Sequence, residues 1–288
     1  METAKHPCFS DEARCAHGRI HLPVAKDCNI ACIYCNRAYD CLNESRPGVT
    51  SRILSPEEAC ACLDMALARV PNLSVVGIAG PGDPLANPES TLATFALVKE
   101  RYPKLLLCLS TNGLALPEYA ADLCAVGIGH VTVTVNAVHP DVGKHIYSWV
   151  RDKNVRHTGK VAAALLLDRQ RDGIARLRKR GIRIKINTVL MRENVEHAPL
   201  IAREVASWGV QRMNCIPLIP VPGTKKAKEK PPASADLERV RKACEIHVPQ
   251  MRTCTRCRAD AVGLLDASRP LETVLQSQAQ VRLCPDIS

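Results

Sequence analysis

Short apolar runs alternate with longer helical stretches along most of this chain, and few folds are compatible with that order. The apolar runs predict strands over residues 19–25, 74–79, 104–110, 131–136, 182–190 and 213–216. Helices are predicted over residues 56–70, 88–101, 118–126, 160–180, 195–208 and 235–246. Strands that alternate with helices run parallel and are joined by right-handed crossovers. Six such units are too few to close an eight-stranded barrel, so we predict an α/β fold built as a partial (β/α)6 barrel.

Two segments lie outside this predicted core. Residues 1–18 precede the first strand and residues 251–288 follow the last helix, so we expect a core over 19–250 with an extension at each end. Residues 217–232 are rich in Pro and Lys and predict a long loop. In parallel α/β sheets, ligands bind beyond the carboxyl ends of the strands. The loops that follow the strands are therefore expected to carry the function.

The chain is rich in cysteine, with 15 among 288 residues. Residues 1–8 contain no apolar run that resembles a secretory signal, and no apolar segment approaches the ~18–20 residues that cross a membrane. We therefore expect a cytoplasmic protein with no membrane partner. Thiols stay reduced in the cytoplasm, so cysteine clusters there indicate metal sites or catalysis.

The net charge of +10 is compatible with binding to a nucleic acid, an anionic lipid or an anionic small ligand. The basic residues are scattered, however, and aromatic residues make up only 3% of the chain. Few side chains are available to stack on bases, so we expect no nucleic-acid partner. The positive charge is either a solvated surface or a means of holding anionic iron–sulfur clusters.

Three cysteines lie directly after the first predicted strand: Cys28, Cys32 and Cys35. Three thiolates on one loop can bind three irons of a [4Fe–4S] cluster and leave the fourth iron without a protein ligand. That iron can bind the amino and carboxylate groups of S-adenosylmethionine (SAM). The CxxxCxxC spacing, with Tyr34 before the last cysteine, resembles the radical SAM signature. The alternatives are a zinc site, which favours CxxC pairs, and a ferredoxin-type site, which favours a CxxCxxC run.

Loops and strands farther along the chain offer contacts for SAM. Segment 79–84 follows the second strand, and its glycines let the backbone approach a ligand closely. Segment 110–113 follows the third strand, and Asn187 lies in the fifth. A turn cap or a satisfied buried amide is the alternative role for the polar residues. The candidate SAM-binding residues are Gly80, Gly82, Asp83, Ser110, Thr111, Asn112 and Asn187.

Several longer stretches resemble the NifB family of radical SAM proteins, which acts in nitrogenase cofactor biosynthesis. The matching stretches include HPC at 6–8, GRIHLP at 18–23, NESRPG at 43–48, AGPGDPL at 79–85 and CTRCRADAVG at 254–263. Residues 35–41 and 146–150 also match, so the resemblance covers residues 6–265. Many members carry a further C-terminal domain of the NifX type, and this chain looks like the short form without it.

The resemblance implies a reaction in which two [4Fe–4S] clusters, a carbon from SAM and one added sulfur form an [8Fe–9S–C] cluster, the precursor of the iron–molybdenum cofactor. One SAM molecule would donate a methyl group to a cluster sulfide, and a second would supply the radical that abstracts hydrogen from that methyl group. The chain would bind three [4Fe–4S] clusters, one with SAM and two as auxiliary clusters. Another radical SAM enzyme with auxiliary clusters and a non-enzymatic iron–sulfur carrier or scaffold are the alternatives.

Three clusters that each keep three protein ligands need about nine ligands. The family pattern implies a first auxiliary cluster on Cys8, His21 and Cys108, and a second on Cys41, Cys254 and Cys257. The CxxC pair at 254–257 is itself a strong metal signal. Cys15 and Cys284 are alternatives to Cys41, and His17 is the alternative to His21. We expect the remaining cysteines to be small core residues; they are Cys15, Cys60, Cys62, Cys124, Cys215, Cys244 and Cys284.

Glu44 and Arg46 lie in the loop after the cysteine triplet. A surface ion pair is one interpretation, whereas the resemblance implies that they lie near the auxiliary clusters and take part in catalysis. The resemblance also implies three kinds of partner: iron–sulfur cluster donors, an electron donor of the ferredoxin or flavodoxin type, and carriers or maturases of the nitrogenase cofactor. We expect a monomer.

Overall fold

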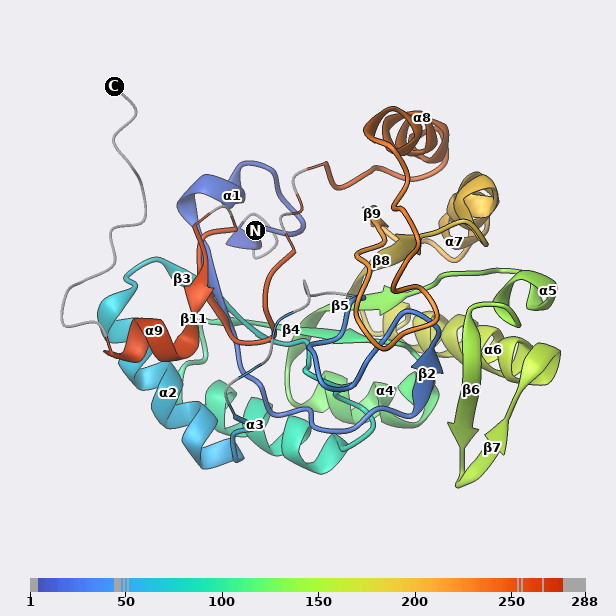
Figure 1. Cartoon of the computed structure of the whole chain (residues 1–288). Helices are drawn as coiled ribbons and strands as arrows, with labels where there is room; N and C mark the ends of the chain where they lie inside the picture. The colour runs from blue at the N-terminus through green and yellow to red at the C-terminus, as the bar shows by residue number, and fades with distance from the viewer. Residues whose placement is uncertain are drawn as a thin grey trace.

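The computed structural model describes residues 5–43, 48, 50, 52–252, 254, 256–265 and 267–276. An eight-stranded sheet runs through it in the order β11-β10-β1-β3-β4-β5-β8-β9 (Figure 1). Its strands are β1 (Gly18–His21), β3 (Leu73–Ile78), β4 (Leu106–Thr111), β5 (Ile128–Thr134), β8 (Arg183–Leu190), β9 (Arg212–Pro217), β10 (Ala261–Gly263) and β11 (Arg269–Pro270). Neighbours from β1 to β9 pair in parallel, whereas β10 is antiparallel to both β1 and β11. The predicted α/β fold with six parallel strands is confirmed.

Helices connect the parallel strands and cover the outer side of the sheet (Figure 1). The longer ones are α2 (Pro56–Arg69), α3 (Pro88–Arg101), α4 (Leu116–Ala125), α6 (Gly159–Arg178), α7 (Ala198–Ser207) and α8 (Ser234–Glu245). The shorter ones are α1 (Ala13–Ala16), α5 (Pro140–Gly143), α9 (Leu271–Gln276) and the 3-10 helix η2 (Val195–His197). The helix predicted over 195–208 is therefore η2 followed by α7. None of the described helices is long and apolar enough to cross a membrane.

The two faces of the sheet differ in chemistry. Successive side chains of a strand point to opposite faces, and Ile20, Leu107 and Val131 pack into the main hydrophobic core under the helices. Their neighbours therefore point to the inner face. His21 on β1 is in register with residue 77 on β3, which is in register with Cys108 on β4. A row of potential ligands thus crosses the inner face of the sheet.

A second, three-stranded sheet is absent from the sequence prediction. It contains β2 (Ile30–Cys32), β6 (Tyr147–Asp152) and β7 (Val155–His157), all antiparallel. Lys153 and Asn154 have φ values of 46° and 66° and form the tight turn between β6 and β7. Because β2 contains the middle cysteine of the triplet, its pairing with β6 fixes the cysteine loop in place.

The first strand is shorter than predicted. β1 ends at His21 and not at residue 25. Beyond it, the backbone N–H of Leu22 still donates to the Gly77 carbonyl at 2.9 Å, and Ala25 forms a bridge with Pro81. The segment that leads to the cysteine triplet therefore runs beside the loop that follows β3.

The C-terminal region pairs with the free edge of β1. The Arg19 guanidinium donates to the carbonyls of Gly263 at 2.5 Å and Leu264 at 2.9 Å. These contacts join residues 244 and 245 positions apart in the sequence. The division into 1–18, 19–250 and 251–288 stays a prediction.

Candidate functional site

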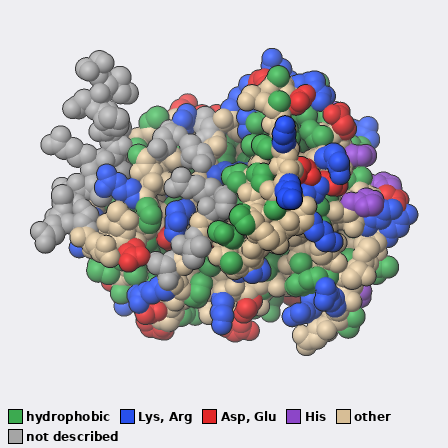
Figure 2. All heavy atoms as spheres, viewed as in Figure 1, with side chains coloured by type: hydrophobic (Ala, Val, Ile, Leu, Met, Phe, Trp, Pro, Cys, Tyr) green, Lys and Arg blue, Asp and Glu red, His purple; other side chains and the backbone are tan. Residues whose placement is uncertain are grey.

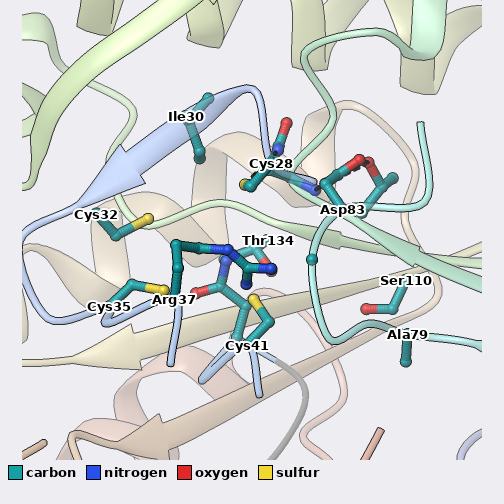
Figure 3. Close-up of a pocket in the computed structure, with 14 residues that line it drawn as sticks. Cys28, Ile30, Cys32, Cys35, Arg37, Cys41, Ala79, Asp83, Ser110 and Thr134 are labelled. Atoms are coloured by element: carbon teal, nitrogen blue, oxygen red, sulfur yellow. Dashed lines mark hydrogen bonds between the residues drawn. The ribbon is translucent and has the colours of Figure 1, made fainter. Parts of the chain in front are cut away.

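Four cysteines line one pocket beyond the carboxyl end of β1 (Figure 3). Three of them are the predicted triplet, Cys28, Cys32 and Cys35, and the fourth is Cys41. Cys32 is held by the pairing of β2 with β6, and the Cys35 backbone N–H donates to the Cys32 carbonyl at 3.1 Å.

Burial dominates the electrostatics of these thiols. It raises the pKa of Cys28 to about 12, and it also raises the pKa of Cys32 and of Cys35. The charge of Arg37 partly opposes this rise in the pKa of Cys35. Without metal the thiols are therefore protonated, and metal binding must release their protons.

Arg37 also lines the pocket and is not among the predicted site residues. Its guanidinium donates to the carbonyls of Pro81 at 2.6 Å and Lys26 at 2.7 Å. Figure 3 shows the side chain pointing into the middle of the pocket. Arg37 thus ties the cysteine loop to the loop after β3, and its one sequence signal is its position two residues after Cys35.

The loops after β3 and β4 form a polar wall beside Cys28 and across the pocket from Cys32 and Cys35 (Figure 3). The Asp83 carboxylate accepts hydrogen bonds from the Thr111 hydroxyl at 3.0 Å and from the Asn112 backbone N–H at 2.6 Å. The Asn112 amide donates to the Asn29 side chain at 2.7 Å, next to Cys28 in the sequence. The predicted SAM contacts that line the pocket are Gly82, Asp83, Ser110, Thr111 and Asn112.

Two predicted SAM contacts are not among the lining residues. The Gly80 carbonyl accepts a hydrogen bond from the Ala25 N–H at 3.3 Å, so Gly80 joins the loop after β3 to the segment before the triplet. Asn187 is buried on β8, and its amide donates to the Asn43 carbonyl at 2.7 Å. Asn187 therefore supports the segment that contains Cys41, behind the pocket.

A second group of candidate ligands lies on the inner face of the sheet. The ring of His21 covers Gly77, where an added Cβ would come within 2.9 Å of the imidazole. Cys108 is the register neighbour of Gly77 on the other side. The Nδ1 atom of His21 lies 3.1 Å from the Arg258 carbonyl oxygen. The structure thus brings His21 and Cys108 onto one row and links His21 to the C-terminal region.

The other predicted auxiliary ligands lie in two neighbouring places. Cys8, Cys254 and Cys257 pack together around Met251, and Cys254 also packs against the apolar core around β2. Cys41 instead lies with the triplet. Within the described part of the chain, no three His, Cys, Asp or Glu side chains come close enough together to hold a single metal ion.

Comparisons with known proteins identify the family. The model of the radical SAM superfamily matches residues 22–205. SuiB of Streptococcus suis, solved with bound S-adenosylmethionine, has the same fold, with a TM-score of 0.60 and 15% identity over 81% of this chain and 49% of that chain. The FeMo cofactor biosynthesis protein NifB of Chlorobaculum tepidum is 46% identical over 266 residues, 92% of this chain and 63% of the relative. NifB of Methanocaldococcus jannaschii is 45% identical over 275 residues, 94% of this chain and 89% of the relative. This chain belongs to the NifB family.

As a NifB-family radical SAM protein, the chain uses SAM and a [4Fe–4S] cluster. The residues of the pocket fit that pair, because Cys28, Cys32 and Cys35 surround one cavity whose opposite wall is polar. These thiols would hold the cluster, and the wall around Asp83 would bind SAM. The chain spans 63%, 52% and 54% of the length of three NifB relatives.

Three residues named in the sequence prediction lie outside the described residues: Glu44, Arg46 and Cys284. The alternatives Cys15 and His17 are exposed and half-buried, respectively.

The remaining cysteines divide into two groups. A core position is confirmed for Cys60, Cys62, Cys215 and Cys244 and is wrong for Cys15 and Cys124, which are exposed. Cys124 follows the buried Leu123 on α4 and so lies off the packed face of that helix.

Proposed function

We propose that this chain is a carbide-inserting radical SAM enzyme. It fuses two substrate [4Fe–4S] clusters, a carbon from SAM and one added sulfur into the [8Fe–9S–C] precursor of the nitrogenase iron–molybdenum cofactor. One observation supports this most directly: Cys108 and Ser110 lie two residues apart on β4, so their side chains share a face about 7 Å apart. Ser110 lines the SAM pocket, so a cluster near Cys108 would lie next to it.

The 5′-deoxyadenosyl radical would form in the cysteine pocket. When bound there, the cluster and SAM give a 5′-deoxyadenosyl radical by one-electron cleavage of a C–S bond. The residues of this chain orient SAM and exclude water. Asp83 is 4% exposed and Asn112 is 3% exposed, so the polar wall is shielded from solvent and its donors are already oriented before SAM arrives.

The substrate clusters bind on the inner face of the sheet and at the C-terminal region. The first uses Cys8, His21 and Cys108, and the second uses Cys41, Cys254 and Cys257. Cys8 packs against the same apolar cluster as Cys254 and Cys257, so the two clusters would bind side by side, as their fusion requires. The neutral imidazole of His21 binds iron more weakly than a thiolate does, so His21 detaches when the clusters rearrange. A His21→Cys protein should therefore form product slowly, and a normal rate would contradict this role.

The carbon arrives in two steps. One SAM would donate its methyl group to a sulfide of a substrate cluster and leave as S-adenosylhomocysteine. The radical from a second SAM would take one hydrogen atom from that methyl group and leave as 5′-deoxyadenosine, and the other two hydrogens would leave as protons, with the electrons coming from the clusters and the external donor. Glu44 and Arg46 serve these steps by contacting the substrate clusters and moving protons. The Glu44→Gln variant should cleave SAM but yield less product, and unchanged cleavage and yield would remove the case for Glu44.

Anaerobic reconstitution tests the whole proposal. The protein should bind about twelve irons per chain. On reduction with SAM it should form S-adenosylhomocysteine, 5′-deoxyadenosine and a carbide-containing cluster. A modified peptide or organic cofactor as product would indicate a different radical SAM enzyme, and cluster binding without SAM cleavage would indicate a carrier.

A basic groove beside the cysteine loop supports an acidic electron donor of the ferredoxin or flavodoxin type as partner. The groove is lined by Ile33, which lies between two ligand cysteines, and by Lys225, Arg192, Lys144 and His145 among others. The backbone N–H of Lys225 donates to the Ile33 carbonyl at 3.1 Å. Figure 2 shows Lys and Arg side chains near the loop between β9 and α8. Cluster donors and cofactor carriers or maturases complete the expected partners.

A further inference from the structure

Two buried histidines outside the predicted ligand set lie against each other. His6 is in the N-terminal region and His130 is on β5, and their ring centroids are 4.5 Å apart. Phe9 packs edge-on against both rings, at 4.9 Å from His6 and 4.7 Å from His130. The two histidines are 1% and 3% exposed. They therefore form a closed aromatic cluster inside the protein.

The hydrogen bonds of this pair are incomplete. The backbone N–H of Cys8 donates to Nδ1 of His6 at 3.2 Å, so a neutral ring carries its proton on Nε2. Within the described part of the chain, His6 Nε2 and both ring nitrogens of His130 are buried without a hydrogen-bond partner. A buried donor without an acceptor is costly, and such groups in native proteins call for an explanation.

The position of the pair indicates what the missing acceptor is. His130 is the register neighbour of Cys108 on β5, so it extends the row that contains His21. His6 is two residues before Cys8 in the sequence. His130 thus lies beside Cys108, and His6 is close in sequence to Cys8; the proposed function assigns both cysteines to the first substrate cluster. The sulfides and thiolates of such a cluster are anionic acceptors of hydrogen bonds.

We propose that His6 and His130 line the site of the first substrate cluster and that His6 donates a hydrogen bond from Nε2 to a sulfur of that cluster. The inference rests on the proposed function, since it needs a cluster at Cys8, His21 and Cys108. A hydrogen bond to sulfur stabilises the more negative, reduced state of a cluster, so it raises the reduction potential. His6 is therefore a positioning and tuning residue with no iron bond of its own.

The test compares two substitutions of His6 in the reconstituted full chain. His6→Phe keeps the ring shape but removes the donor, whereas His6→Gln returns an N–H near the position of Nε2. The exposed His139→Phe variant is the matched control. The measurements are iron per chain and a redox titration followed by electron paramagnetic resonance.

We expect His6→Phe to lower the potential of one auxiliary cluster, or to lose that cluster, and His6→Gln to restore the wild-type behaviour. The signal of the SAM-binding cluster should not change in either variant. Equal potentials in all proteins, or loss of the same four irons in both His6 variants, would overturn the donor role. Wild-type protein with only four irons would overturn the proposed function itself and the inference with it.

Discussion

The Asp83 carboxylate accepts a 2.6 Å hydrogen bond from the backbone N–H of Asn112. This bond joins the loop after β3 to the loop after β4 at the edge of the cysteine pocket. Asp83 also accepts from the Thr111 hydroxyl and from the Leu85 N–H, both at 3.0 Å. One buried side chain therefore fixes the shape of the polar wall.

Removing this carboxylate should weaken both the fold and SAM binding. In Asp83→Ala, buried donors lose their acceptor, and each such loss costs about 1–3 kcal/mol. We expect the free energy of unfolding in urea to fall by about 2–4 kcal/mol and SAM affinity to fall with it. The exposed Asp168→Ala variant on α6 is the control and should stay within about 0.5 kcal/mol of wild type. An equally small change in Asp83→Ala would show that the wall does not depend on this residue.

Adding a methyl group at Gly82 should displace the loop after β3, which lines the cysteine pocket. An added Cβ there would lie 2.0 Å from the Asp27 carbonyl oxygen, which is backbone and cannot rotate away. Such overpacking costs about 1–3 kcal/mol or more, so Gly82→Ala should lower the melting temperature and slow SAM cleavage. At Gly129 on β5 an added Cβ would meet nothing within 4 Å, so Gly129→Ala should leave both quantities unchanged. Equal behaviour of the two variants would contradict this explanation.

Substitutions of the four pocket cysteines should have two different effects on iron content and SAM cleavage. Cys35→Ala should remove the SAM-binding cluster, lower the iron content from about twelve to about eight per chain and reduce 5′-deoxyadenosine to background. Cys41→Ala should still form 5′-deoxyadenosine but not the carbide-containing cluster. The exposed Cys124→Ala variant should match wild type in both assays. If Cys41→Ala abolished SAM cleavage while Cys35→Ala retained it, Cys41 would be the third ligand of the SAM-binding cluster.

Charge reversal in the basic groove should slow electron delivery. Lys225→Glu places a negative charge beside the Ile33 carbonyl contact, where it would repel an acidic donor. We expect the rate of reduction by a ferredoxin or flavodoxin to fall about tenfold at low salt and the difference to shrink as salt screens the charges. Reduction by dithionite should be unchanged. Lys179→Glu, at the end of α6, is the control; an equal loss in that variant would mean that net charge and not the groove sets the rate.

The main sheet could be predicted because its signals are local. Each strand of the core is a short apolar run, and the start of α2 is marked by a complete capping box. Ser55 accepts from the Glu58 N–H at 3.2 Å, and the Glu58 carboxylate accepts from the Ser55 N–H at 2.9 Å. These patterns depend on neighbouring residues alone.

The unpredicted parts depend on contacts between distant segments. β2 is three residues long and contains a cysteine, so it has no alternating pattern of its own and exists because β6 pairs with it. The grouping of Cys41 with the triplet and of Cys8 with the CxxC pair likewise comes from packing across the fold. The hairpin of β6 and β7 could have been found, because Lys153 and Asn154 are a two-residue connection between short β-branched or aromatic runs.

The hydrogen bonds from Arg19 to Gly263 and Leu264 also limit when β1 can be completed during synthesis of the chain. β1 is made long before β10, the strand that pairs with its outer edge. Until β10 is made, the edge of β1 is unpaired, and the Arg19 guanidinium lacks the carbonyl acceptors that offset the cost of burying its charge. Cys8 can meet Cys254 and Cys257 only after that step, so an iron site that uses both regions can form only once the chain has been made through β10.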